Sequence, residues 1–252
     1  MLKLCIVFES EADRKIGCDL ADRVVVECIH WLQDQPDLLQ YQREWVFQQQ
    51  GRMFRWDTID DHARNMDLNL RGHWEDGEEN YPDFKAAVRA LRVIRNLFDD
   101  VDVVFLIRDT DDQPDRVLGL NQAKNRFDGK PHGFRVLVGA AQPKRECWVL
   151  AGFVPNGEAE AGLLEAERQY LGFDPTARSQ ELTAKNNETQ DKRSAKRVVA
   201  NLTQRSFERE EECWTNTPLK HLKAKGQANG LADYLHKIEE VLVPMVQNRK
   251  QS

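Results

Sequence analysis

Three short apolar runs, each followed by polar or charged residues, stand out in the first 140 residues. Residues 3–8, 101–107 and 134–138 are almost wholly apolar and rich in β-branched side chains, a pattern typical of buried strands. The first run ends at Glu9, and the second leads directly into Asp109, Thr110, Asp111 and Asp112 after Arg108. The chain therefore places acidic residues at the carboxyl ends of at least two predicted strands.

Helical periodicity fills most of the sequence between these strands. Residues 12–33 and 82–98 repeat apolar positions at helical spacing, and residues 114–127 follow a proline that suits a first helical turn. Strands that alternate with helices predict a parallel sheet with right-handed crossovers. Residues 37–80 fit neither period, and we expect an irregular insertion there with room for one strand.

The second half of the chain is predominantly helical in pattern. Residues 144–150 fit a strand or a short helix equally well, whereas 158–171, 192–205 and 230–246 predict helices. We therefore expect an α/β protein with a parallel-sheet core flanked by helices in residues 1–155. A helical C-terminal extension, residues 156–252, is expected to pack on this core.

Composition and charge narrow the function classes only slightly. The 252 residues carry a net charge of -6, which gives no overall attraction to nucleic acid, so contact with nucleic acid needs a local basic patch or a metal. The 192–205 segment offers such a patch without an acidic residue. Its five basic side chains are Lys192, Arg193, Lys196, Arg197 and Arg205.

The chain also lacks the marks of membrane or secreted proteins. No apolar run is long enough to span a bilayer, and acidic residues come too early in the chain for a secretory signal. Five cysteines without a CxxC pair argue against a disulfide framework. We expect a protein of the reducing cytosol, the cytoplasmic compartment, that makes no membrane contact.

Carboxylates at neighbouring strand ends repel one another unless a cation compensates them. The ends of parallel strands meet at one edge of a sheet, where ligands commonly bind. Mg²⁺ prefers oxygen ligands, so Asp109 and Asp111 are predicted to hold Mg²⁺, with Mn²⁺ as a possible substitute and Glu9 as a further ligand or proton carrier. The alternative is that these acids are solvated turns.

Charged residues beyond the third strand could join the same site. Lys144 or Arg145 would counter phosphate charge, and Glu146 would add a metal ligand; the alternative is an exposed charged turn. Glu11, Asp13 and Asp112 fit helix N-terminal charges better than ligands. The chain has no P-loop, no GxGxxG fingerprint, no HExxH and no zinc-like Cys/His spacing.

Together, the stretches CIVFESEAD, VVFLIRDTDD and PKRECWVLAGF resemble the Toprim superfamily, the fold shared by topoisomerases, primases and overcoming-lysogenization-defect nucleases. More narrowly, the Arg-Glu-x-Trp-x-Leu-Ala stretch at 145–151 is similar to that of small stand-alone Toprim-like proteins that often accompany ATPases in prokaryotic anti-phage defence. The resemblance implies a Toprim-like Rossmannoid core in which Glu9, Asp109 and Asp111 are the motif acids and Glu146 is a further acid. Ser10 differs from the glycine that many Toprim domains have.

The leading hypothesis is a Mg²⁺-dependent nuclease that hydrolyses phosphodiester bonds in DNA or RNA, as the effector of an antiviral defence system. Glu9, Asp109, Asp111 and Lys144 would be catalytic, and the 192–205 basic helix would bind backbone phosphate. One alternative is a regulatory or effector subunit that is active only with an ATPase partner. Another is a phosphatase, because Asp109-x-Asp111 also resembles the haloacid-dehalogenase motif. The sequence leaves open whether the chain forms a homo-oligomer.

Overall fold

The core of the protein is a four-stranded parallel sheet. A computed structural model describes residues 1–66, 80–128, 133–185 and 191–249. The strand order is β2-β1-β5-β6, with all pairs parallel, and β3 and β4 form a separate antiparallel hairpin. The strands are β1 (Leu2–Val7), β2 (Arg43–Val46), β3 (Gln48–Gln49), β4 (Arg52–Met53), β5 (Val103–Asp109) and β6 (Arg135–Ala141). The predicted α/β fold with a parallel sheet is confirmed.

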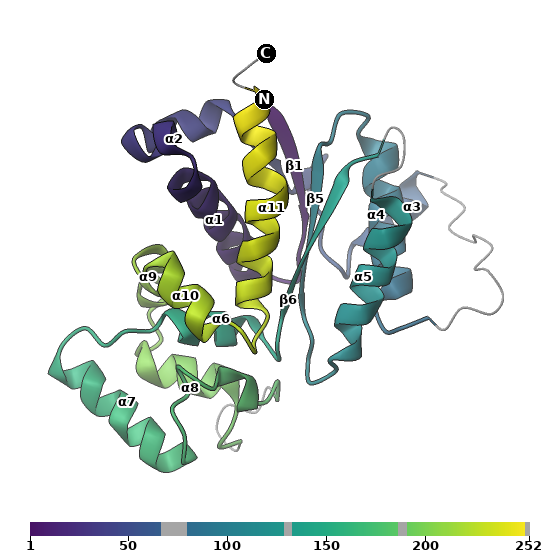
Figure 1. Cartoon of the computed structure of the whole chain (residues 1–252). Helices are drawn as coiled ribbons and strands as arrows, with labels where there is room; N and C mark the ends of the chain where they lie inside the picture. Colours follow the sequence, from purple (N-terminus) through teal and green to yellow (C-terminus); the bar gives the residue numbers. More distant parts are fainter. Residues whose placement is uncertain (67–79, 129–132, 186–190, 250–252) are drawn as a thin grey trace.

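Helices cover both faces of this sheet (Figure 1). Helices α1 and α11 pack on one face, and α4 and α5 pack on the other. Helices α6 to α10 gather beyond the carboxyl ends of the strands. The helices are α1 (Glu11–Cys28), α2 (His30–Asp34), α3 (Ile59–Asn65), α4 (Phe84–Leu97), α5 (Asp115–Phe127), α6 (Arg145–Gly152), α7 (Glu158–Leu171), α8 (Ala195–Leu202), α9 (Phe207–Thr215), α10 (Leu219–Lys225) and α11 (Leu231–Arg249), with 3-10 turns η1 (Pro36–Tyr41) and η2 (Ser179–Glu181).

The insertion at 37–80 is more regular than its sequence pattern indicates. It supplies β2 to the edge of the sheet, followed by the β3–β4 hairpin and α3, while residues 67–79 lie outside the described residues. The hairpin turns at Gln50 and Gly51, both at positive φ, as two-residue hairpin loops require. The apolar residues here fit no single period because the segment changes element every few residues.

The predicted helices are right in position but not in all their boundaries. The 12–33 segment breaks at Ile29, which separates α1 from α2. The 144–150 segment is helical, as α6. The predicted 192–205 helix is too long, because α8 ends at Leu202 and the next turn holds Gln204 and Arg205 at φ 52° and 62°. Helices α9 and α10 were not predicted.

The C-terminal extension shares a core with the sheet. Leu235 and Ile238 of α11 belong to the same apolar cluster as Ile6 and Phe105 of the strands. Gly230, at φ 85°, brings the start of α11 against β6, where a Cβ atom would lie 2.0 Å from the carbonyl oxygen of Ala140. Among the described helices, α11 included, none has the length and apolar content that crossing a bilayer requires.

Side-chain alternation along β1 and β5 decides which residues can meet at the strand ends. Ile6 and Phe8 of the first strand, like Phe105 and Ile107, face α1 and α11, whereas Val7 and Leu106 face α4 and α5. Successive side chains in a strand point to opposite faces. Asp109, two residues after Ile107, therefore belongs to the α1 and α11 face.

Candidate metal centre

Asp109 is the last residue of β5, and its carboxylate is almost fully buried, with 9% of the residue exposed. The backbone N–H of Arg145 donates to Asp109 Oδ1 over 2.8 Å. Backbone bonds tie this strand end to the loop after β6, because the N–H groups of Thr110 and Asp111 donate to the carbonyls of Ala141 and Pro143. The turn after β5 is thus held rigidly against the start of α6.

Two further carboxylates approach Asp109 from neighbouring helices. Asp13 comes from the first turn of α1 and Glu146 from the first turn of α6, and both side chains are only 9% exposed. Burial first, and then the negative charges of Asp13 and Glu146, raise the pKa of Asp109 to about 8. Burial likewise raises the pKa of Asp13, and the charge of Glu146 adds to this.

Asp111 experiences the opposite electrostatic environment. Lys144 Nζ donates to Asp111 Oδ1 over 2.8 Å, and an Arg116 guanidinium nitrogen donates to Asp111 Oδ2 over 2.8 Å. Partial burial opposes ionisation, but the hydrogen bond and charge of Lys144, with the charge of Arg116, bring the pKa of Asp111 below its usual value. Asp111 is held at φ 48°, a left-handed conformation that Asp tolerates better than most residues.

Lys144 also approaches Asp109, the other acid of the Asp109-x-Asp111 motif. Its Nζ lies 3.6 Å from Asp109 Oδ2, and its side chain is 7% exposed. Burial alone would lower the pKa of Lys144, but the hydrogen bond to Asp111 and the charge of Asp109 raise it. Lys144 is therefore a charged internal counter-ion between the two motif carboxylates.

Arg145 compensates the carboxylates on the other side of Asp109. Its guanidinium lies 3.7 Å from Asp13, 3.5 Å from Glu146 and 3.0 Å from Glu210 of α9. We call Asp13, Asp109, Asp111 and Glu146 the strand-end cluster. These four acids and Glu210 share three cationic side chains, Lys144, Arg145 and Arg116, so acids outnumber bases in a largely buried space.

Glu9 does not join this cluster. It lies two residues after Val7, so alternation places it on the α4 and α5 face, opposite to that of Asp109. There its Oε2 accepts a hydrogen bond from Arg108 over 3.0 Å, and 44% of its side chain is exposed. Strand alternation, which a common position at the sheet edge conceals, separates the two predicted ligands.

Asp13 is the site residue that the sequence analysis assigned to another role. Its carboxylate does cap the N-terminus of α1, because the backbone N–H of Ser10 donates to Asp13 Oδ2 over 2.8 Å. The same side chain also faces Asp109 and Glu146. Its place in the first turn of the helix after β1 is a usable signal, because that turn lies beside the strand ends.

The other two acids assigned to local roles lie outside the cluster. Glu11 pairs with Arg14 on the surface of α1. Asp112 accepts a hydrogen bond from the backbone N–H of Ala184 over 3.0 Å. That bond brings the segment before α8 close to the motif turn.

The carboxylate oxygens of the strand-end cluster suit a hard divalent cation, but in this structure they pair with the side chains of Lys144, Arg145 and Arg116. In residues 1–66, 80–128, 133–185 and 191–249, no group of three or more His, Cys, Asp or Glu side chains is arranged to hold a metal ion. The four acids of the strand-end cluster nevertheless offer only oxygen atoms, which Mg²⁺ prefers. Burial, together with the charges of Asp13 and Glu146, outweighs the effect of Lys144 and keeps the pKa of Asp109 raised.

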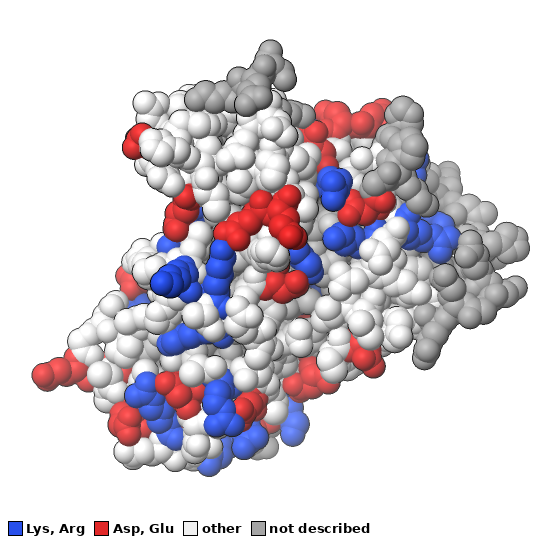
Figure 2. Space-filling view, in the orientation of Figure 1, with Lys and Arg blue, Asp and Glu red and all other residues white. Residues whose placement is uncertain are grey.

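The predicted nucleic-acid-binding helix is less available than its sequence indicates. Arg197 makes two 2.7 Å hydrogen bonds to the buried carboxylate of Glu167. Lys192 and Arg193 lie over the rings of Tyr170 and Phe173. Figure 2 shows acidic and basic side chains interspersed over the region of α7 and α8. This surface is not a uniformly basic face.

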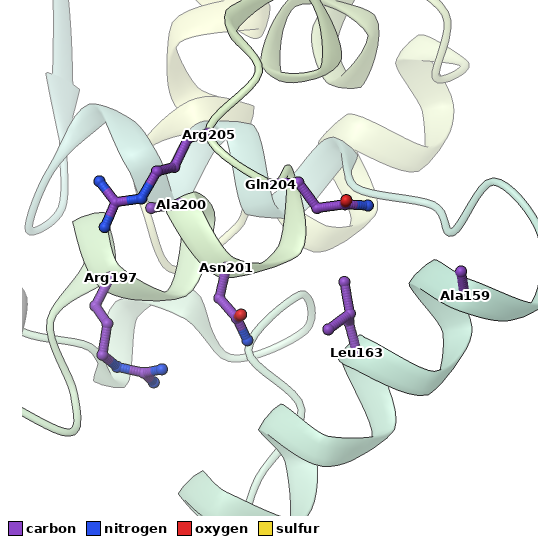
Figure 3. A pocket seen from close by; sticks show the side chains of 7 residues that line it. All are labelled: Ala159, Leu163, Arg197, Ala200, Asn201, Gln204 and Arg205. Carbon is purple, nitrogen blue, oxygen red and sulfur yellow. The ribbon is translucent and has the colours of Figure 1, made fainter.

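A cavity of about 680 Å³ lies between α7 and α8 (Figure 3). Arg197, Asn201 and Arg205 supply polar groups to its wall, and Leu163 supplies an apolar one. Asn201, like Arg197, donates to Glu167, so much of this polar lining is already engaged. None of the acids of the strand-end cluster lines this cavity.

Comparisons with models of protein families, with curated proteins and with solved structures find no match to this chain.

Proposed function

We propose that the protein hydrolyses phosphodiester bonds in nucleic acid with the help of Mg²⁺ bound at the strand-end cluster. The observation that carries this proposal is Asp109, buried among other carboxylates with its pKa raised to about 8. Burying carboxylates together is costly without compensation. A site that buries carboxylates together in spite of this free-energy cost is suited to binding a cation.

Asp109, Asp111 and Glu146 are the proposed ligands for the ion, and Asp13 is a fourth oxygen donor beside them. When bound, Mg²⁺ would activate water and neutralise charge that develops on phosphate oxygens. Lys144 stands between Asp109 and Asp111, and its ammonium group would counter the negative charge of substrate phosphate there. Arg116 would keep Asp111 ionised, through the 2.8 Å hydrogen bond that it already makes.

Glu9 has a different role in this proposal. Its exposed carboxylate, held by Arg108 on the opposite face of the sheet, suits proton transfer at the edge of the site better than metal coordination. We also propose that the protein acts in the cytosol. All five cysteines are free, as a reducing compartment would leave them.

Cleavage of plasmid DNA and of transfer RNA tests the proposal. We expect cleavage by the wild type with Mg²⁺, none with a chelator, and none in Asp109→Asn. Asp99→Asn is the matched control, because Asp99 is exposed and precedes β5 at the opposite edge of the sheet. Metal-dependent cleavage that persists undiminished in Asp109→Asn would contradict the proposal. Cleavage that appears only after a partner protein is added would favour the regulatory-subunit alternative.

A further inference from the structure

A second polar cavity, of about 560 Å³, lies in the insertion at the start of α3. Its volume is within the range of pockets that hold small ligands. The hairpin β3–β4 and the helix α3 form its walls. Its lining residues are Gly51, Arg52, Met53, Arg55, Thr58, Asp61, Arg64 and Asn65. We call it the arginine pocket, because three arginines and only one carboxylate, that of Asp61, are among these lining residues.

The arginines of this pocket are only partly compensated. Arg52 is exposed and makes no ion pair with any of the residues that the structure describes. Arg55 pairs with Asp57 at 3.0 Å through one terminal nitrogen, whereas its Nε is buried and has no hydrogen-bond partner among the described groups. Arg64 pairs with Asp61 at the surface. The Arg55 side chain is nevertheless 43% exposed, so its terminal nitrogens can reach a ligand in the pocket.

The arginine pocket is continuous with the carboxyl end of β1. Arg55 pairs with Phe8 as an isolated parallel bridge, so the pocket wall extends the sheet beside the residue that precedes Glu9. The next residue, Trp56, donates from its indole nitrogen to the carbonyl of Ile107 over 2.7 Å. The guanidinium of Arg108, which holds Glu9, lies 5.5 Å from the Trp56 ring centroid. One aromatic residue thus separates the pocket from the residues that flank Asp109.

We propose that the arginine pocket binds a backbone phosphate of a polynucleotide whose reacting phosphate lies at the strand-end cluster. This inference rests on the proposed function and adds to it a second phosphate-binding site for the nucleic-acid substrate, away from the reacting phosphate. Guanidinium groups bind phosphate through paired hydrogen bonds. Arg52 and the terminal nitrogens of Arg55 would meet the phosphate, and Arg64 would exchange its contact with Asp61 for one with the ligand.

A phosphate contact at the arginine pocket, besides the one at the strand-end cluster, would allow a chain of net charge -6 to hold a polyanion. Phosphate contacts dominate nucleic-acid affinity and depend on local rather than overall charge. The basic 192–205 segment cannot supply all of that contact, because Arg197 is engaged with Glu167.

Binding of fluorescein-labelled single-stranded 12-mers of DNA and RNA, measured by anisotropy in a chelator, tests the pocket without cleavage. We expect Arg52→Gln/Arg64→Gln to bind about 5- to 10-fold more weakly at ~100 mM salt, and the salt dependence to become shallower by about one contact or more. Lys220→Gln, which removes one exposed charge on α10, should change affinity less than about 2-fold.

Small substrates separate this inference from the proposed function. Hydrolysis of bis-p-nitrophenyl phosphate with Mg²⁺ should be the same in Arg52→Gln/Arg64→Gln as in the wild type, because this phosphodiester is too small to reach the pocket. Unchanged oligonucleotide affinity and salt dependence in the double variant would overturn the pocket assignment while leaving the proposed function intact. Equal competition of the labelled 12-mer by inorganic phosphate and by an unlabelled 12-mer would overturn the polymer assignment.

Discussion

Buried carboxylates occur in two regions of this protein, and only one region compensates them fully. In the helical extension, Glu160 accepts two 2.8 Å hydrogen bonds from Arg209, and Glu167 accepts two 2.7 Å bonds from Arg197. The hydrogen bond from Arg209 lowers the pKa of Glu160. At the strand ends, burial and neighbouring acids raise the pKa of Asp109 to about 8.

The comparison teaches that neighbouring charges, added to burial, distinguish a carboxylate that is paired within the fold from one that can take up a cation. Each of these two glutamates accepts two hydrogen bonds from one arginine, in the two-pronged geometry that suits a carboxylate. The strand-end cluster shares Lys144, Arg145 and Arg116 among more acids than cations. A pair of the first kind stabilises the fold, whereas the second arrangement gains stability when a further cation arrives.

The largest expected effect comes from breaking a compensated pair. Arg197→Met should lower the free energy of unfolding by about 3–5 kcal/mol, because it leaves Glu167 buried without its partner. Urea denaturation at pH 7 measures this change. The double variant Arg197→Met/Glu167→Gln should recover part of the loss, and a single-variant loss below ~1 kcal/mol would show that the pair is not structural.

The uncompensated acid should show itself in the pH dependence of stability. The pKa of Asp109 in the folded protein, about 8, lies above its ordinary value of 3.8, so the unfolded chain loses this proton first. Without divalent cations the wild type should therefore lose stability through this group as pH rises from about 4 to 8. Asp109→Asn should lack this component. Parallel pH profiles for the two proteins would contradict the account.

Removing the internal counter-ion should have a smaller effect that metal reverses. Lys144→Met should lower the free energy of unfolding by about 1–2 kcal/mol in a chelator, since Arg116 still compensates Asp111. Mg²⁺ should raise the melting temperature of this variant more than that of the wild type, because the ion no longer competes with an ammonium group. An equal or smaller shift in the variant would count against competition at this position.

The smallest effect is expected at Glu9. Its ion pair with Arg108 is partly exposed, so Glu9→Gln should change the free energy of unfolding by less than about 1 kcal/mol. The Mg²⁺ affinity of the Glu9→Gln variant should stay within ~3-fold of that of the wild type, because Glu9 is not among the proposed metal ligands. A loss of Mg²⁺ affinity as large as that of Asp109→Asn would place Glu9 among the ligands after all.

The sequence predicts the sheet and the motif turn because both depend on local patterns. Apolar runs identify β1, β5 and β6, and the acids that follow them identify the edge at which Asp109 and Asp111 lie. The partnership of these acids is not local. Arg116 and Lys144 reach Asp111 from different elements, and only the packing of α6 against the end of β5 reveals that Arg145 serves Asp13 as well as Glu146.

The separation of Glu9 from Asp109 follows from the alternation of side chains along a strand. Side chains alternate between the two faces along a strand, so once β1 and β5 are paired in register, counting residues places Glu9 and Asp109 on opposite faces of the sheet. By contrast, nothing in the basic pattern of 192–205 signals that Arg197 is committed to Glu167. That pairing joins residues 30 apart through the packing of α7 and α8.

Calorimetric titration of Mg²⁺ into the wild type at pH 7.5, repeated in two buffers of different ionisation enthalpy, tests the central claim most directly. Because Asp109 is largely protonated at this pH, binding should release a proton, and the measured heat should differ between the buffers. Asp99→Asn should behave as the wild type does, and Asp109→Asn should lose both the binding and the proton release. Absence of Mg²⁺ binding by the wild type, or unchanged binding by Asp109→Asn, would contradict a metal centre at the strand-end cluster.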